Sequence, residues 1–246
     1  MFFLPIFAPS KQNLMNKTKP ISGKTKLAEL IASNHRLLQL LSRFGISLGF
    51  GDRSIEEVCR INDVSTELFL IICDIYSDSN YKPNRTDFQH IDMRGLLPYL
   101  KASHQYYLEE RFPHIEEHLQ RIIKASGPKY GPMLSHFYDE YKKEVMQHIQ
   151  YYEEEVVFPY IEALRKGEKP TSYNINEFRH NHTNIQDTLD DMMNILIKYL
   201  PGDILPMERI EISLDIMELS ADLSCHSRLE DDVLIPYVES LEKAQP

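Results

Sequence analysis

The chain has 246 residues, 42% of them hydrophobic and 26% charged, which is enough for a medium-sized domain with a small module beside it. A net charge of −10 with dispersed basic residues disfavours a nucleic-acid partner, and only 9 glycines disfavour a fold of many short strands. Three cysteines cannot all form disulfides within the chain, which favours a reducing compartment. No stretch approaches the roughly 20 apolar residues of a membrane-spanning helix. We therefore expect a soluble, cytoplasmic protein with no membrane association.

The first part of the chain predicts a leader and a small helical module. Residues 1–23 open on an apolar stretch broken by Pro5, and we interpret them as a disordered leader or as a mis-called translation start, with Met15 as the alternative first residue. Residues 24–79 repeat apolar positions at helical spacing and predict a compact helical module. In it, Ser54 followed by Glu57 predicts a capped helix start, and Ser65 predicts another. Residues 80–87 predict a linker.

The remainder, residues 88–246, predicts an all-α domain of four long helices. Breaks rich in glycine and proline separate the expected helices, which cover residues 88–125, 132–166, 173–200 and 206–242. Short connections favour antiparallel neighbours and therefore an up-down-up-down bundle. Three prolines fall inside these helices and should kink or locally unwind them: Pro113, Pro159 and Pro236.

An internal repeat relates the two halves of the bundle. Residues 153–164 align with residues 230–241 at half of their positions, and each copy follows a histidine, His148 or His226. His104 and His182, on the preceding helices, are separated by the same number of residues as that pair. The bundle therefore reads as two copies of one helical hairpin.

The repeat predicts a carboxylate-bridged site for two metal ions. Positions equidistant from a hairpin turn share a level, so four imidazoles and two carboxylates can converge in the interior. We expect one ion on His104 and His148 and the other on His182 and His226. The expected bridges are Glu153 and Glu230. Each ion would keep open positions for dioxygen, peroxide or nitric oxide.

Two alternatives qualify this hypothesis. Glu153 lies five residues after His148, which places the two side chains about 140° apart round an α-helix. Either a kink brings Glu153 to the face of His148, or Glu144 or Tyr152 is the ligand in its place. The repeat could also be a decayed duplication whose acidic residues are only a solvated surface.

The residues from His104 to Glu110, from His148 to Pro159, and from His226 to Pro236, together with His182, resemble the hemerythrin-like bundle family. With the small N-terminal module, residues 24–242 more closely resemble the repair-of-iron-centres proteins. That resemblance implies two iron ions, with manganese as the alternative, and iron–sulfur proteins as clients under nitrosative and oxidative stress. Two features depart from it: Ser47 follows Gly45-Ile46 where adjacent cysteines are common, and no histidine stands at residues 124–127.

The resemblance implies repair of iron–sulfur clusters damaged by nitric oxide or peroxide. The alternative is a module that binds or senses dioxygen or nitric oxide without turnover. Catalytic reduction of nitric oxide or peroxide, a metal-free interaction role and a homodimer are left open by the sequence.

Overall fold

The N-terminal module consists of four short helices in the computed structural model, which describes residues 21–84, 88, 90–168, 170, 173–181 and 186–244. Ser54 and Glu57 form the predicted capping box, and the Ser65 hydroxyl accepts a hydrogen bond from the Leu68 N–H. The helices are α1 (Leu27–Ser33), α2 (Leu37–Arg43), α3 (Ile55–Ile61) and α4 (Thr66–Ser77).

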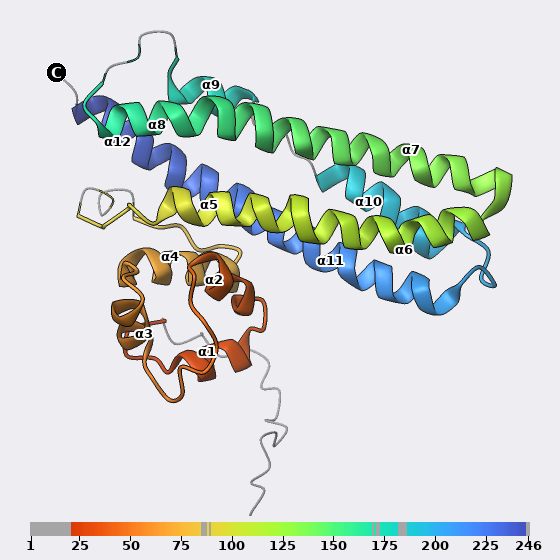
Figure 1. The fold of residues 1–246 in the computed structure, drawn as a ribbon, viewed down its shortest axis with the longest axis horizontal. Helices are drawn as coiled ribbons and strands as arrows, with labels where there is room; N and C mark the ends of the chain where they lie inside the picture. Colours follow the sequence, from red (N-terminus) through yellow and green to blue (C-terminus); the bar gives the residue numbers. More distant parts are fainter. Residues whose placement is uncertain are drawn as a thin grey trace, which may run out of the picture.

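Four long helical rods form the up-down-up-down bundle, and they run side by side in Figure 1. The first bundle helix is α5 (Leu96–Gln105), η2 (Tyr106–Arg111) and α6 (Phe112–Ala125), and the second is α7 (Gly127–Met146), η3 (Gln147–Val157) and α8 (Phe158–Arg165). The third contains α9 (Ile175–Asn181), α10 (Gln186–Asn194) and η4 (Ile195–Tyr199), and the fourth is α11 (Pro206–Leu229), η5 (Glu230–Leu234) and α12 (Ile235–Ala244). The predicted all-α fold with its four-helix bundle is confirmed.

The turn between the first two bundle helices is tighter than expected. Residues 126–132 were predicted as a break, but α7 already begins at Gly127, whose φ of +64° makes the turn in the left-handed region. Pro128 fits the first helical turn, where its missing N–H costs nothing. Gly131 lets the helices approach, because a Cβ atom there would lie 2.7 Å from the Ile123 carbonyl oxygen.

The first bundle helix also begins later than predicted, at Leu96 and not at residue 88. Ahead of it, the Asp92 carboxylate accepts hydrogen bonds from both the backbone N–H and the side chain of Arg94. This local turn competes with helix formation over those residues.

At the three internal prolines the helices are locally unwound into π-helical turns, one of the two outcomes expected there. The segments η2, η3 and η5 end two residues before Pro113, Pro159 and Pro236, respectively. A proline ring collides with the carbonyl group four residues earlier in an α-helix, and the wider π-turn removes that carbonyl from its path.

Two apolar clusters fill the interior. One joins the module to the nearer half of the bundle and includes Leu40, Phe69, Phe158 and Leu229, while the other fills the distal half. The module therefore packs beneath α5 and α11 as part of a continuous core, as Figure 1 shows. Among the described residues, no helix combines the length and apolar character needed to span a bilayer.

Candidate metal centre

Five of the six predicted ligands lie together in the bundle, between the two apolar clusters. They come from the last turn of α5, from η3, from the end of α11 and from the first residue of η5: His104, His148, Glu153, His226 and Glu230. All five are buried, and the side chains of His104, Glu153 and Glu230 are wholly inaccessible. The sixth, His182, lies outside the described residues, so its role stays a prediction.

Glu153 stands at the centre of the arrangement. Its Oε2 lies 3.0 Å from His104 Nε2 and 3.9 Å from His226 Nε2, whereas its Oε1 lies 3.1 Å from His148 Nε2. Two groups of potential ligand atoms result, one with His104 and His226 and one with His148 and Glu230, and both include Glu153. Within each group the atoms lie within 4.8 Å of one another. One carboxylate with an oxygen turned toward each group has the geometry of a bridge between two cations.

The histidines are grouped differently from the sequence-based pairing. His104 was expected to share an ion with His148, but its Nε2 lies 3.3 Å from Nε2 of His226. The symmetry about the turn fixes a residue's level along the bundle, but each helix has two neighbours at that level. The first bundle helix packs against the fourth through α6 and α11 as well as against the second. The His104 side chain lies between these two neighbours, against Glu153 on the second and His226 on the fourth.

The π-helical segment η3 explains how Glu153 reaches the site. In a π-helix, the i→i+5 hydrogen bond places residue i+5 nearly above residue i, so His148 and Glu153 share a face. Glu144 is exposed and Tyr152 is half-buried with its ring 6.5 Å from the ring of His148. Glu144 therefore belongs to neither of the two groups of potential ligands.

The electrostatics of the cluster fit a bound cation. Burial alone would raise the pKa of Glu153, but His104, His148 and His226 hold it well below its usual range. Burial alone would lower the pKa of His226, but Glu230 and Glu153 raise it to about 10. The buried carboxylates therefore require positive charge at this point, which a metal ion supplies in place of imidazolium protons.

The hydrogen-bonding state of Glu153 supports the same fit. Both of its carboxylate oxygens are completely buried, and within the described part of the chain neither makes a hydrogen bond of normal geometry. A buried carboxylate without such bonds is costly unless it is paired with a charge or coordinates a metal. The donor set of imidazole and carboxylate groups suits iron or manganese.

Several supporting residues had no role assigned from the sequence. Glu154 Oε1 lies 2.9 Å from His104 Nδ1, the arrangement in which a carboxylate orients a metal-binding imidazole. The Phe158 ring stacks on His104 at 5.5 Å, and the Tyr107 ring meets His226 edge-on at 5.6 Å. The three consecutive glutamates at 153–155 were the available signal, because a ligating histidine commonly has such an orienting partner.

Other histidines lie apart from the centre. His114 and His118 have ring centroids 4.7 Å apart on α6, and His114 contacts Asp215. His180 is exposed on α9, and His35 lies 3.7 Å from Glu218 at the surface. None of these four belongs to the two groups of buried ligands.

The comparisons with known proteins agree with this geometry. The model of the hemerythrin HHE cation binding domain matches residues 87–238, a range that contains all six predicted ligands and more than half of the chain. No curated protein and no solved structure gave a match. With its four-helix bundle and its buried histidine and glutamate cluster, the chain belongs to the hemerythrin HHE cation-binding domain family.

Proposed function

We propose that the chain is a di-iron protein of the stress response that repairs iron–sulfur clusters damaged by nitric oxide or peroxide. The observation that carries the di-metal part of this proposal is the position of Glu153 between two groups of ligands. The repair role is supported by the resemblance of residues 24–242, module included, to the repair-of-iron-centres proteins.

The described side chains suit a centre that holds iron and admits small molecules. Bound iron would supply metal for a damaged cluster and coordination positions for nitric oxide, dioxygen or peroxide. His104, His148 and His226 provide neutral ligands, and Glu153 and Glu230 provide the charge. The three imidazoles and two carboxylates of the described residues would not fill the coordination spheres of two iron ions, even if Glu153 were shared, and would leave positions for small ligands.

The chain's own thiols do not suit cluster chemistry. The chain has three cysteines, Cys59, Cys73 and Cys225, and all are buried. Burial raises the pKa of Cys59 and of Cys225 to about 11, so both stay protonated near neutral pH. Repair by this chain therefore depends on iron supplied from the bundle and not on thiolates of the module.

Metal content per chain is the first test. Protein purified without air or chelator, with iron supplied during expression, should contain about two irons per chain by plasma mass spectrometry. A folded sample with no stoichiometric metal would contradict the di-iron proposal and favour a metal-free interaction role.

Cluster repair is tested with an iron–sulfur hydratase inactivated by nitric oxide or by peroxide. Incubation with the iron-loaded protein and a thiol reductant, which supplies the electron that accompanies the incoming ferrous ion, should restore hydratase activity while the iron content of the protein falls. Metal-free protein and the Glu153→Gln variant are the controls for iron transfer, and an equal concentration of free ferrous iron is the control for leakage. If the hydratase stays inactive while the protein retains its iron, the repair role is wrong.

Reversible sensing is the second candidate, and the contact between module and bundle favours it. The module shares one apolar cluster with the bundle half that borders the metal centre. Sensing predicts a reversible spectral change on addition and removal of nitric oxide, without consumption of the gas. Catalytic turnover of nitric oxide or peroxide would contradict it.

A further inference from the structure

A buried arginine of the module lies between the module and the bundle. Arg43 ends α2, and its side chain is 2% exposed. Its Nη1 donates a hydrogen bond of 2.9 Å to Oδ1 of Asp222 on α11, and its Nη2 donates to the other carboxylate oxygen. Tyr76 of α4 also donates to Asp222, at 2.6 Å, and accepts a bond from Arg43. A fork-like arginine–carboxylate pair thus fixes α2 and α4 against α11.

Aromatic rings of the first bundle helix complete the surroundings of this cation. The guanidinium carbon lies 5.9 Å from the ring centre of Tyr99, 5.2 Å from that of Tyr106 and 5.3 Å from that of Tyr107. A cation within about 6 Å of an aromatic face is attracted to it, and the attraction grows when water is excluded. Arg43 therefore contacts two bundle helices at once.

Both sets of contacts lead to the same metal ligand. Asp222 precedes His226 by four residues on α11, so the two side chains lie on one face of that helix. The Tyr107 ring lies edge-on to the His226 imidazole, at 5.6 Å and 82°. One cation from the module thus holds the carboxylate one turn before His226 and the ring that packs against it.

The stability of the fold does not account for this arrangement. Burying an ion pair is a poor way to stabilise a fold, because the desolvation of both charges offsets their attraction. The module and bundle already share an apolar cluster that includes Leu40, Phe69 and Leu229. What the charged pair adds is one fixed position of the module on α11, because the planar guanidinium of Arg43 fits the Asp222 carboxylate in a single geometry.

We propose that Arg43 is a positioning residue for the metal centre: through Asp222 and Tyr107 it holds His226 in place, so module docking and metal binding are coupled. This inference rests on the proposed di-metal function. Coupling between two sites is reciprocal, so bound metal should also hold the module more firmly on the bundle.

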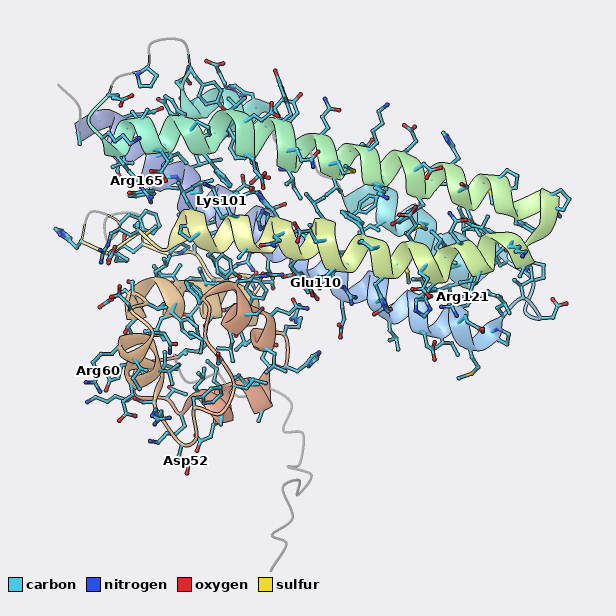
Figure 2. All side chains as sticks on the ribbon, viewed as in Figure 1. Asp52, Arg60, Lys101, Glu110, Arg121 and Arg165 are labelled. Atoms are coloured by element: carbon cyan, nitrogen blue, oxygen red, sulfur yellow. The ribbon has the colours of Figure 1, made fainter. Side chains whose placement is uncertain are left out.

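The first test compares metal binding in variants. Arg43→Met leaves Asp222 as a lone buried charge and could fail to fold, so the informative variant is Arg43→Met with Asp222→Asn, in which both charges are removed. Arg60→Met is the matched control, because Arg60 is exposed on α3, at the side of the module in Figure 2. We expect the double variant to keep the helical circular dichroism of the control and to bind ferrous iron about tenfold more weakly.

Cobalt(II) provides a readout that a merely structural role would not change. Its visible absorption depends on the arrangement of its ligands, so a displaced His226 alters the spectrum even at saturating metal. We expect altered bands in the double variant, partial recovery in Arg43→Lys, and the wild-type spectrum in Arg60→Met. A folded double variant with the control's iron affinity and cobalt spectrum would overturn the proposal.

The second test needs no substitution. Hydrogen exchange of backbone amides in α2 and α4 should be about tenfold slower in iron-loaded than in metal-free wild-type protein. Equal exchange in the two forms overturns the coupling but leaves the di-iron proposal intact. If wild-type protein holds no stoichiometric metal, both proposals fall together.

Discussion

His148 and Glu153 are five residues apart, yet Nε2 of the one lies 3.1 Å from Oε1 of the other. In a regular α-helix the two side chains would lie about 140° apart. The π-helical segment η3 brings them to one face and ends two residues before Pro159. Pro159, which is not itself a ligand, therefore follows the π-helical turn that places Glu153 in the site.

Replacing the shared carboxylate should cost more metal than replacing its repeat counterpart. Because Glu153 belongs to both groups of ligands and Glu230 to one, we expect Glu153→Gln to lose both ions and Glu230→Gln to keep about one. Plasma mass spectrometry measures this, with Glu155→Gln, an exposed neighbour, as the control. The spacing in the sequence alone, five residues from His148 to Glu153 against four from His226 to Glu230, would predict a larger loss for Glu230→Gln. Equal losses of metal in the two variants would contradict a bridging role specific to Glu153.

Removing the proline should let the π-turn revert to an α-turn. In Pro159→Ala, the new N–H can bond the Glu155 carbonyl and the clash of the ring disappears. Glu153 would then rotate away from His148, so we expect unchanged helical circular dichroism and iron affinity weaker by about tenfold or more. Pro132→Ala, which replaces an exposed proline inside α7, is the matched control. Full iron affinity in Pro159→Ala would show that packing, and not Pro159, maintains the π-turn.

The orienting carboxylate should contribute to metal affinity without binding the metal. Glu154→Gln keeps the size of the side chain but weakens its bond to His104 Nδ1, so we expect iron affinity to fall by about 10- to 100-fold at unchanged stoichiometry. Competition with a ferrous chelator measures the affinity. A loss of one whole equivalent of iron would instead make Glu154 a ligand.

The sixth predicted ligand can be tested against a close neighbour in the chain. His182→Ala should lose about one ion per chain if the repeat has been interpreted correctly. His180→Ala should lose none, because His180 is exposed on α9. Identical metal contents in the two variants would exclude His182 from the centre.

The module contains a carboxylate whose charge should destabilise the fold near neutral pH. Burial and the nearby Asp78 raise the pKa of Asp74 to about 6, from about 3.9 in an unfolded chain. The fold carries no penalty from Asp74 while this group is protonated, below about pH 4, and stability is lost as the pH rises from there through 6. Since the side chain is only half-buried, Asp74→Asn should be more stable than wild type at pH 7 by about 1 kcal/mol.

Urea unfolding at pH 4 and pH 7 measures this difference, which should nearly vanish at the lower pH. Asp52→Asn is the control, because Asp52 is exposed on the same module (Figure 2). A stabilisation of the same size at both pH values would point to a cause other than the charge of Asp74.

The sequence by itself determined the helices, their order and the residues that carry chemistry. Apolar spacing, the caps at Ser54 and Ser65 and the repeated hairpin are local or periodic features, and they survive folding because each helix buries its own apolar face. The repeat also singled out five residues that the fold brings together.

Only the tertiary structure decided how those residues combine. His104 meets His226 because the first bundle helix packs against the fourth, and that contact is not encoded in the spacing of residues along one helix. The burial of Arg43 against Asp222 joins residues far apart in the chain and had no local signal. The repeat determines how far along the bundle a residue lies and which residue types stand there. Which side chains then meet across the bundle depends on how the close-packed interior is filled.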